Sequence, residues 1–423
     1  MLTIQQIKAD PEQVVARLAI KGFDGKDAIA RVIALDDRRR ELQLKNDNAA
    51  AQLKKMSDAI GKAMKAGNKD EAEAAKKEQA ALKDEQKAFA DELAKTEADI
   101  RTELLNIPNL PCAMVPEGRT AEDNVVEKTG GPMPELPADA LPHWDLAKKY
   151  NIIDFDLGVK ITGAGFPVYL GKGAKLQRAL IQFFLDEASK AGYLEVQPPY
   201  VVNEASGYGT GQLPDKEGQM YYCPADGLYL IPTAEVPVTN LYRDVIIPAD
   251  RLPIKNCAYS ACFRREAGSY GRDVRGLNRL HQFDKVEIVR IEKPENSYAA
   301  LEEMKDHVQG LLEKLGLPWH ILRLCGGDMS FTSAITFDFE VFSAAQKRWL
   351  EVSSVSNFET YQANRLKCRF RGDDKKTQLC HTLNGSALAL PRIMAALLEN
   401  NQTPEGIVVP ECLRKYTGFD IID

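Results

Sequence analysis

The chain has 423 residues, which is enough for two or three domains, and its 44% apolar content excludes a disordered or fibrous protein. Its net charge of -6 means that any contact with nucleic acid must come from a local basic surface. The eight cysteines are scattered, without a CxxC pair or a Cys/His cluster at zinc-ligand spacing, so we expect no zinc and a reducing compartment. The sequence has no signal-peptide pattern and no uncharged apolar run long enough for a bilayer, which predicts a cytoplasmic protein without a membrane partner.

Two long helices are predicted near the N-terminus, after a short helix that begins at Pro11. Residues 27–101 contain almost no Pro or Gly except at Gly61 and at residues 66–68, which predict a tight turn between the helices. An apolar heptad pattern on the first helix indicates an antiparallel coiled-coil hairpin. The heptad positions are Leu35, Leu42, Ala49, Met56 and Ala63.

The charges of these helices are complementary. Residues 31–69 carry ten Lys/Arg and five Asp/Glu, whereas residues 70–100 carry five and ten. The basic surplus of the first helix could meet a phosphate backbone. A self-neutralising coiled coil without a partner explains the same pattern, and the residues alone favour that explanation.

A Pro-rich, aperiodic stretch over residues 107–142 marks a domain boundary. We therefore place an N-terminal domain at residues 1–105, a linker and entry to the core at 106–150, and a core at 151–423. Strand-like runs dominate the core without regular βαβ alternation. This pattern predicts an α+β fold, a mostly antiparallel sheet flanked by helices. Because the chain has neither a P-loop nor a Rossmann fingerprint, any phosphate chemistry would have to use arginines.

A charged β-hairpin is predicted between Cys262 and Glu287, around a Gly-rich loop. A guanidinium suits a phosphate, a carboxylate suits an amine, and an aromatic ring suits a base. A polar hairpin with surface ion pairs is the competing explanation. By alternation the outgoing strand presents Arg264 and Glu266 on one face, and the return strand presents Arg279, His281, Phe283, Lys285 and Glu287.

Three further segments combine polar residues with element ends. Thr233-Ala234-Glu235 begins a predicted helix, and capping alone would explain it. Glu351-Val352-Ser353-Ser354 ends a strand with oxygen ligands that suit Mg²⁺, although a lone solvated Glu is commoner. Strict alternation groups Glu351 with Ser353, so pairing Glu351 with Ser354 requires a bulge or a strand end.

The last segment, Asn384-Gly385-Ser386, precedes a helix with Pro391 at its first position. Arg392 and the helix N-terminus would then both face an anion. A simple ion pair of Arg392 with a carboxylate is the alternative.

Taken in order, these segments resemble the three signature motifs of class II aminoacyl-tRNA synthetases. Residues 192–199 are similar to motif 1, residues 263–287 to motif 2, and residues 385–392 to motif 3. The helical arm, Thr233-Ala234-Glu235, and the motif-2 segments 267–273 and 281–287 resemble the seryl-tRNA synthetase family in particular.

The resemblance implies ATP-dependent attachment of L-serine to serine tRNA through a seryl-adenylate, with selenocysteine tRNA open as a second substrate. It also implies a homodimer whose helical arm contacts the long variable arm of serine tRNA. Three rivals are a class II enzyme for threonine or proline, a paralogue that charges a carrier protein, and a synthetase-like RNA-binding protein without catalysis.

The resemblance also assigns residue roles. Arg264 and Arg392 would be catalytic. The residues implied for serine are Thr233, Ala234, Glu235, Arg264, Glu287 and Ser386. The residues implied for ATP are Arg264, Arg265, Glu266, Phe283, Glu351, Val352, Ser353, Ser354 and Arg392. The implied Mg²⁺ ligands are Glu351 and Ser354.

Overall fold

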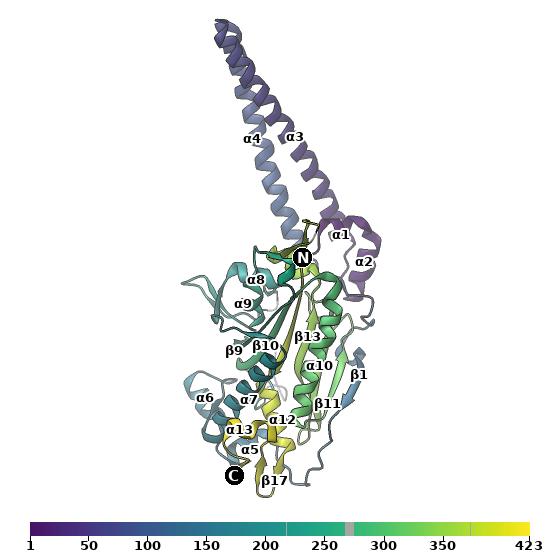
Figure 1. Cartoon of the computed structure of the whole chain (residues 1–423), viewed down its shortest axis with the longest axis vertical. Helices are drawn as coiled ribbons and strands as arrows, with labels where there is room; N and C mark the ends of the chain where they lie inside the picture. The colour runs from purple at the N-terminus through teal and green to yellow at the C-terminus, as the bar shows by residue number, and fades with distance from the viewer. Residues whose placement is uncertain (217, 267–274, 373) are drawn as a thin grey trace. The chain divides into compact units, whose positions relative to one another are not determined.

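The computed structural model describes residues 1–216, 218–266, 275–372 and 374–423 (Figure 1). The segment 267–273, used in the resemblance above, lies outside these residues. The described chain divides into two compact units, one comprising Met1–Ala19 and Phe23–Pro108, the other Ile20–Gly22 and Asn109–Asp423. None of the helices in the described ranges is both long and apolar enough to cross a membrane.

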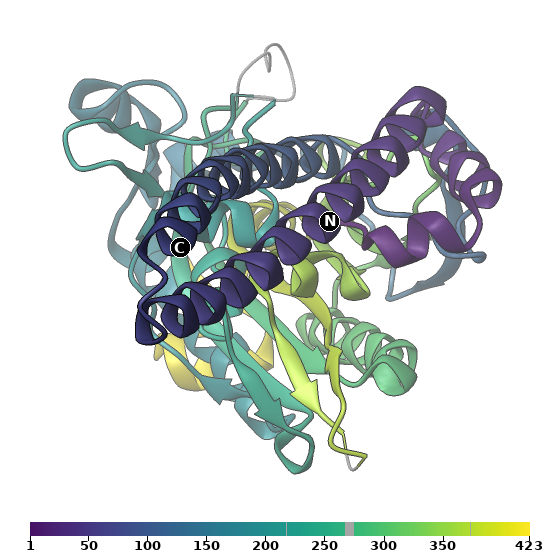
Figure 2. The ribbon, with the colours of Figure 1, turned by 90° about the horizontal axis from the view of Figure 1, so that it is seen from above.

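The N-terminal unit is helical, and its two long helices lie side by side as an antiparallel pair (Figures 1 and 2). The predicted break at Gly61 is wrong, because the first long helix continues through it and the turn comprises residues 66–68. A helix tolerates an interior glycine at a cost of about 1 kcal/mol relative to alanine. The four helices are α1 (Ile4–Ala9), α2 (Pro11–Ile20), α3 (Lys26–Lys65) and α4 (Lys69–Leu105).

The predicted heptad positions of α3 are buried or partly buried, as a coiled-coil seam requires. Leu42 and Ala49 are buried on α3, opposite a helix that buries Ala72 and Ile100. The predicted attraction between the helices is confirmed by two interhelical ion pairs. These are Arg31 with Glu103 at 3.2 Å and Arg38 with Glu92 at 2.6 Å.

Eight strands of the described chain form the main sheet of the second unit, in the order β1-β11-β12-β13-β16-β10-β9-β4. All neighbours are antiparallel except β4 and β9, which are parallel. The predicted α+β fold is confirmed. The strands are β1 (Val125–Gly130), β4 (Leu194–Glu195), β9 (Ile254–Phe263), β10 (Gln282–Glu292), β11 (Trp319–Arg323), β12 (Ile335–Ser343), β13 (Arg348–Asn357) and β16 (His381–Ala389).

Helices cover this sheet because its strands alternate between two apolar clusters. On β10, Val286 and Ile288 belong to the large core, into which α7, α10 and α12 also pack (Figure 1). Val289 and Ile291 face the opposite side, where they pack with Ala234 and Val238 around α9. The helices of this unit are α5 (His143–Lys149), α6 (Phe155–Ile161), α7 (Gly171–Lys190), α8 (Glu204–Thr210), α9 (Glu235–Asn240), α10 (Ser297–Leu315), α11 (Thr360–Leu366), α12 (Leu390–Asn400) and α13 (Glu411–Thr417).

Short strands form small sheets beside the main one. They are β2 (Ile153–Asp154) with β3 (Val168–Tyr169); β5 (Val201–Asn203), β7 (Leu228–Leu230) and β6 (Tyr222–Cys223); β8 (Ile246–Pro248), β14 (Arg369–Arg371) and β15 (Thr377–Leu379); and β17 (Gln402–Thr403), β18 (Gly406–Val408) and β19 (Ile421–Ile422).

Candidate active site

A buried polar cluster lies on the α9 face of β10. Glu287 is only 1% exposed and pairs with Lys285 at 2.5 Å. The Thr233 hydroxyl donates to Glu287 Oε2 at 3.0 Å and accepts from Lys285 Nζ at 2.9 Å. Asn384 Nδ2 donates to the other Glu287 oxygen at 3.0 Å. The competing explanation of surface ion pairs is therefore wrong for Lys285 and Glu287, since alternation cannot distinguish a polar pocket from the surface.

Ser386 joins this cluster through the sheet. The antiparallel register of β10 and β16 places Glu287 directly opposite Ser386, and both residues are buried. Such opposite residues have Cβ atoms about 5 Å apart. Glu287 and Ser386, two of the residues that the resemblance implies for serine, therefore lie next to each other.

Glu235 is the second buried carboxyl of the cluster. Burial raises its pKa to about 7, and the charge of Glu287 adds to the shift. A hydrogen bond from Gln362 Nε2 at 2.7 Å and the charges of Lys285 and Arg264 oppose the shift. A cationic ligand would stabilise the charged form of this carboxyl, which burial and a neighbouring carboxylate disfavour.

Helix capping explains less of the Thr233-Ala234-Glu235 segment than the sequence suggested. Ala234 occupies the N-cap position of α9 and is fully buried. Thr233 accepts from the Glu235 backbone N–H at 3.2 Å, but it also bonds the charged groups of β10. The segment therefore links the helix to the polar cluster.

Arg264 begins the loop beyond β9. The strand ends at Phe263 and Glu266 has a φ of +49°, so the predicted shared strand face of Arg264 and Glu266 is wrong. The Arg264 guanidinium lies 5.2 Å from the centre of the Phe283 ring. Glu266 accepts from Arg279 Nη1 at 2.6 Å.

Arg265 differs from its neighbour Arg264. Its side chain is exposed, and its backbone N–H donates to the Gln219 carbonyl at 2.9 Å. Of the two consecutive arginines, the structure places only Arg264 beside Phe283.

A β-bulge brings Glu351 and Ser354 together. The register of β12 and β13 shifts between the pairs Phe339–Ser353 and Glu340–Glu351. Ser354 Oγ then lies 3.4 Å from Glu351 Oε1. The predicted bulge is confirmed.

Asp338 lies opposite Ser354 and had no predicted role. Its Oδ1 is buried without a hydrogen-bond partner among the described residues. Burial raises its pKa well above the usual range, and the Glu351 charge adds to that effect. Next to Ser354 the site therefore contains a carboxyl oxygen that has no hydrogen-bond partner in the part of the chain that the structure describes.

Arg392 hydrogen-bonds to two separate segments of the site, at Asn278 and at Glu351. The helix α12 begins at Leu390, so Pro391 is its second residue and not the predicted first, and Arg392 lies in the first turn as predicted. Arg392 Nε donates to the Asn278 carbonyl at 2.8 Å and Nη1 to the Glu351 carbonyl at 2.7 Å. The Glu351 carboxylate is 3.7 Å from Nη1, so the predicted alternative of an ion pair is also present.

Two residues implied for ATP are buried instead of facing a ligand. Val352 packs in the large core at 1% exposure. Ser353 Oγ donates to the Ser386 carbonyl at 2.6 Å. Only their backbone groups remain as candidates for contact with ATP.

Sequence reasoning gave no role to Lys285, Asn384, Gln362 or Asp338, although the first two lie within segments it quoted. Among them Asp338 has a local signal, since it is a polar residue between two phenylalanines on β12, whereas Gln362 lies on the helix α11. Within the described ranges no group of three or more His, Cys, Asp or Glu side chains could hold a metal. The expectation of no zinc stays a prediction.

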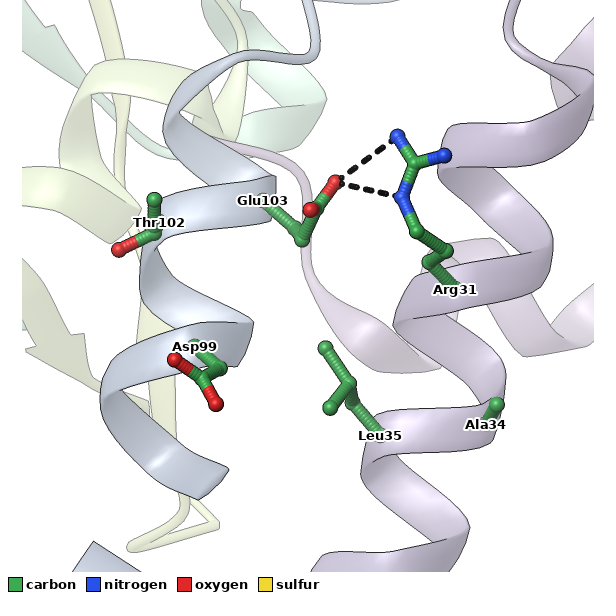
Figure 3. Close-up of a pocket in the computed structure, with 6 residues that line it drawn as sticks. All are labelled: Arg31, Ala34, Leu35, Asp99, Thr102 and Glu103. Carbon is green, nitrogen blue, oxygen red and sulfur yellow. Dashed lines mark hydrogen bonds and ion pairs between the residues drawn. The ribbon is translucent and has the colours of Figure 1, made fainter. Parts of the chain in front are cut away.

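A separate groove of about 480 Å³ lies in the N-terminal unit, between α3 and α4. Figure 3 shows Arg31 and Glu103 reaching toward each other across it. None of its lining residues belongs to the polar cluster. They are Arg31, Ala34, Leu35, Asp99, Thr102 and Glu103.

Two family descriptions match the chain. Residues 221–401 match the tRNA synthetase class II core domain (G, H, P, S and T), and residues 1–111 match the seryl-tRNA synthetase N-terminal domain. The sheet, the charged hairpin and the arginine at the start of α12 thus define a class II aminoacyl-tRNA synthetase.

Relatives that match over their full length identify the family within this class. A serine--tRNA ligase of Salinibacter ruber is 50% identical over 99% of this chain and 98% of its own. One of Chlorobaculum parvum is 46% identical over all of both chains. The crystal structure of seryl-tRNA synthetase from Pyrococcus horikoshii complexed with ATP has a TM-score of 0.92 at 31% identity, covering 100% of this chain and 99% of that one. The chain belongs to the seryl-tRNA synthetase family, whose members attach serine to tRNA.

Proposed function

We propose that the chain activates L-serine with ATP to form seryl-adenylate and then transfers the seryl group to serine tRNA. The observation that carries this proposal is the buried cluster of Thr233, Glu235 and Glu287 next to Arg264. The cluster has the charge and the hydroxyl partner that a small amino acid with an ammonium and a hydroxyl requires. The Pyrococcus horikoshii relative, solved with ATP, supports the nucleotide.

In the first step a serine carboxylate oxygen attacks the α-phosphorus of ATP. A new P–O bond forms, the bond to the β-phosphate oxygen breaks, and pyrophosphate leaves. Positioning and charge neutralisation supply most of the acceleration in phosphoryl chemistry of this kind. Arg264 would neutralise the α-phosphate and orient the serine carboxylate, and Arg392 would hold the γ-phosphate.

In the second step the terminal ribose hydroxyl of the tRNA attacks the seryl carbonyl carbon. The ester bond forms as the mixed anhydride breaks, and AMP leaves. No protein side chain needs to act as a nucleophile in either step.

The exposed Arg265 would contribute to the nucleotide site, as would Glu266 and Phe283.

Glu235 with Thr233 would receive the serine ammonium, and Glu287 with Ser386 the hydroxyl. A site that hydrogen-bonds a substrate hydroxyl rejects the analogue without it, because buried polar groups are then left unpaired. Alanine should therefore be activated poorly without any editing.

Glu351 and Ser354 would hold a Mg²⁺ ion. The site offers oxygen donors alone, which Mg²⁺ prefers, and the unpartnered Oδ1 of Asp338 lies beside it. A bound Mg²⁺ would supply charge neutralisation of the phosphates.

The α3–α4 hairpin would contact the long variable arm of serine tRNA. The half of α3 that precedes the turn at residues 66–68 carries exposed Lys54, Lys55, Lys62 and Lys65, which suit a phosphate backbone. The homodimer, the cytoplasmic location, the domain bounds at residues 105 and 150, and the use of selenocysteine tRNA stay predictions of the same proposal.

One assay tests the core of this proposal. Pyrophosphate exchange with a panel of amino acids should depend on serine, with alanine slower by about 10⁴-fold. Exchange with alanine near the serine rate would contradict the assigned pocket. Charging of serine tRNA in a parallel assay separates an active synthetase from a paralogue that loads a carrier protein or only binds RNA.

A further inference from the structure

A histidine from the predicted linker contacts the segment that precedes β10. His143 is the first residue of α5 and is fully buried. Its ring Nδ1 lies 2.7 Å from Glu399 Oε1, and its backbone N–H donates to the same oxygen at 3.0 Å. On the other side of the ring, Nε2 accepts from the Leu277 backbone N–H at 2.8 Å. The histidine therefore bridges α12 and the chain segment just before β10.

These contacts determine the tautomer of His143. A backbone N–H can only donate, so Nε2 must be the unprotonated nitrogen and Nδ1 carries the hydrogen donated to Glu399. The neighbouring Gly276 has a φ of +64°, and a Cβ there would lie 2.2 Å from Nε2. The backbone is thus brought against the ring at a position that only glycine permits.

Glu399 continues the bridge toward the site. Burial would raise its pKa, but hydrogen bonds from His143 and Ser343 hold it below the ordinary value. Gln346 Nε2 also donates to Glu399 Oε1, at 3.1 Å, and the Gln346 carbonyl accepts from Asn278 Nδ2 at 2.9 Å. The carboxylate thus reaches Asn278 through one amide side chain.

Asn278 is also the residue that orients Arg392. Its carbonyl accepts from Arg392 Nε at 2.8 Å. Arg392 stands at the start of α12 and Glu399 near its end, so residues 277–278 are fixed to both ends of one helix. A shift of this segment would move the carbonyl that directs the guanidinium.

We propose that His143 is a positioning residue for ATP, acting through the Leu277–Asn278 backbone on Arg392. This inference rests on the proposed role of Arg392 in holding the γ-phosphate. Misplacement of a positioning group by about 1 Å can cost up to 10²-fold in rate, so a displaced Arg392 should have a measurable effect.

Two substitutions separate the two hydrogen bonds of the ring. In His143→Gln the amide oxygen can take the place of Nε2 and accept from Leu277, whereas in His143→Asn the amide nitrogen can take the place of Nδ1 and donate to Glu399. In serine-dependent pyrophosphate exchange, His143→Asn should raise KM for ATP about tenfold. His143→Gln should raise it less than about threefold, and KM for serine should stay within about twofold in both.

The opposite results overturn the proposal. If His143 only stabilises α12, Asn should be the better replacement, or KM for ATP and serine should change equally while the melting temperature falls. Gln346→Ala, at a partly exposed turn, gives a second route if the histidine variants do not fold. It should also raise KM for ATP selectively, and an unchanged KM would contradict the bridge.

Arg392→Ala makes failure of the two proposals distinguishable. If this variant leaves KM for ATP unchanged, the proposed role of Arg392 is wrong. If it raises that KM while His143→Asn does not, only the inference about His143 is wrong.

Discussion

The N-terminal hairpin and the class II unit use charge in opposite ways. On the hairpin, Arg38 and Glu92 pair with 41% and 47% of their side chains exposed. Within the sheet, Arg290 and Glu292 pair at 4% and 2% exposed. Exposed pairs are screened by water and are replaceable, whereas a buried charge depends on its partner. The pair between the two hairpin helices thus provides charge complementarity, whereas the buried pair of the sheet fixes side chains in place.

The largest expected effect tests the sheet side of this comparison. Arg264→Ala should abolish serine-dependent pyrophosphate exchange, a loss of about 10³-fold or more, because it removes the charge that stabilises the transition state. The exposed Arg251→Ala is the matched control and should keep its activity. Exchange retained by Arg264→Ala would refute the assigned role.

Stability should separate the two kinds of ion pair. Arg290→Met leaves Glu292 buried and unpaired, which should destabilise the class II unit by about 3–5 kcal/mol. Arg38→Met is the matched substitution on the hairpin and should leave the melting temperature unchanged within error. Calorimetric unfolding measures both, and equal shifts would break the comparison.

Deletion of the hairpin should separate activation from charging. Replacing residues 27–101 with a short flexible linker should leave pyrophosphate exchange intact, because the class II unit has its own core. The kcat/KM for charging serine tRNA should fall by about 10²-fold as phosphate contacts are lost. Charging at the full rate would mean that the hairpin has only a structural role.

The smallest expected effect concerns pH. Glu235 has a pKa raised to about 7, so it becomes protonated as pH falls through 7 and loses its attraction for the serine ammonium. Serine affinity measured by calorimetry should weaken by up to about tenfold per pH unit below 7 and level off above it.

Glu235 affects the stability of the fold in the opposite direction to serine binding: raising the pH strengthens binding but lowers stability. The folded chain holds the Glu235 proton more tightly than the unfolded chain does, so by itself the group makes the fold less stable as pH rises from 4.5 to about 7.

In Glu235→Gln the pH dependence of serine binding should disappear. A wild-type profile in that variant would assign the titration to another group.

The sequence predicted the fold well where periodicity carries the information. The heptads of α3, the strand alternation of β10 and Pro391 at the start of α12 all follow from local geometry. The resemblance pairs Glu351 with Ser354, which under strand alternation requires a bulge or a strand end, and the structure has the bulge. Those elements are largely fixed by their own residues.

The parts that were missed depend on distant contacts. Lys285 and Glu287 have the pattern of a solvent face, but Thr233 and Asn384, more than 50 residues away in each direction, compensate their burial. His143 lies in a segment with the composition of a linker and is held in place by its hydrogen bond with Glu399. Such pairings have no local periodicity, so no window of sequence contains them.

The bulge in β13 has a consequence for protein engineering. The extra residue at Val352 offsets the register, so deleting one residue there would give a regular hairpin with better strand geometry. That deletion would make Glu351 and Ser354 alternate residues, still on the face of Asp338, whereas a regular strand that keeps Val352 would place Glu351 and Ser354 on opposite faces. Idealising this hairpin at its full length, or aligning it by strict strand alternation, would therefore separate the carboxylate of Glu351 from the hydroxyl of Ser354, whereas removing Val352 would keep them together.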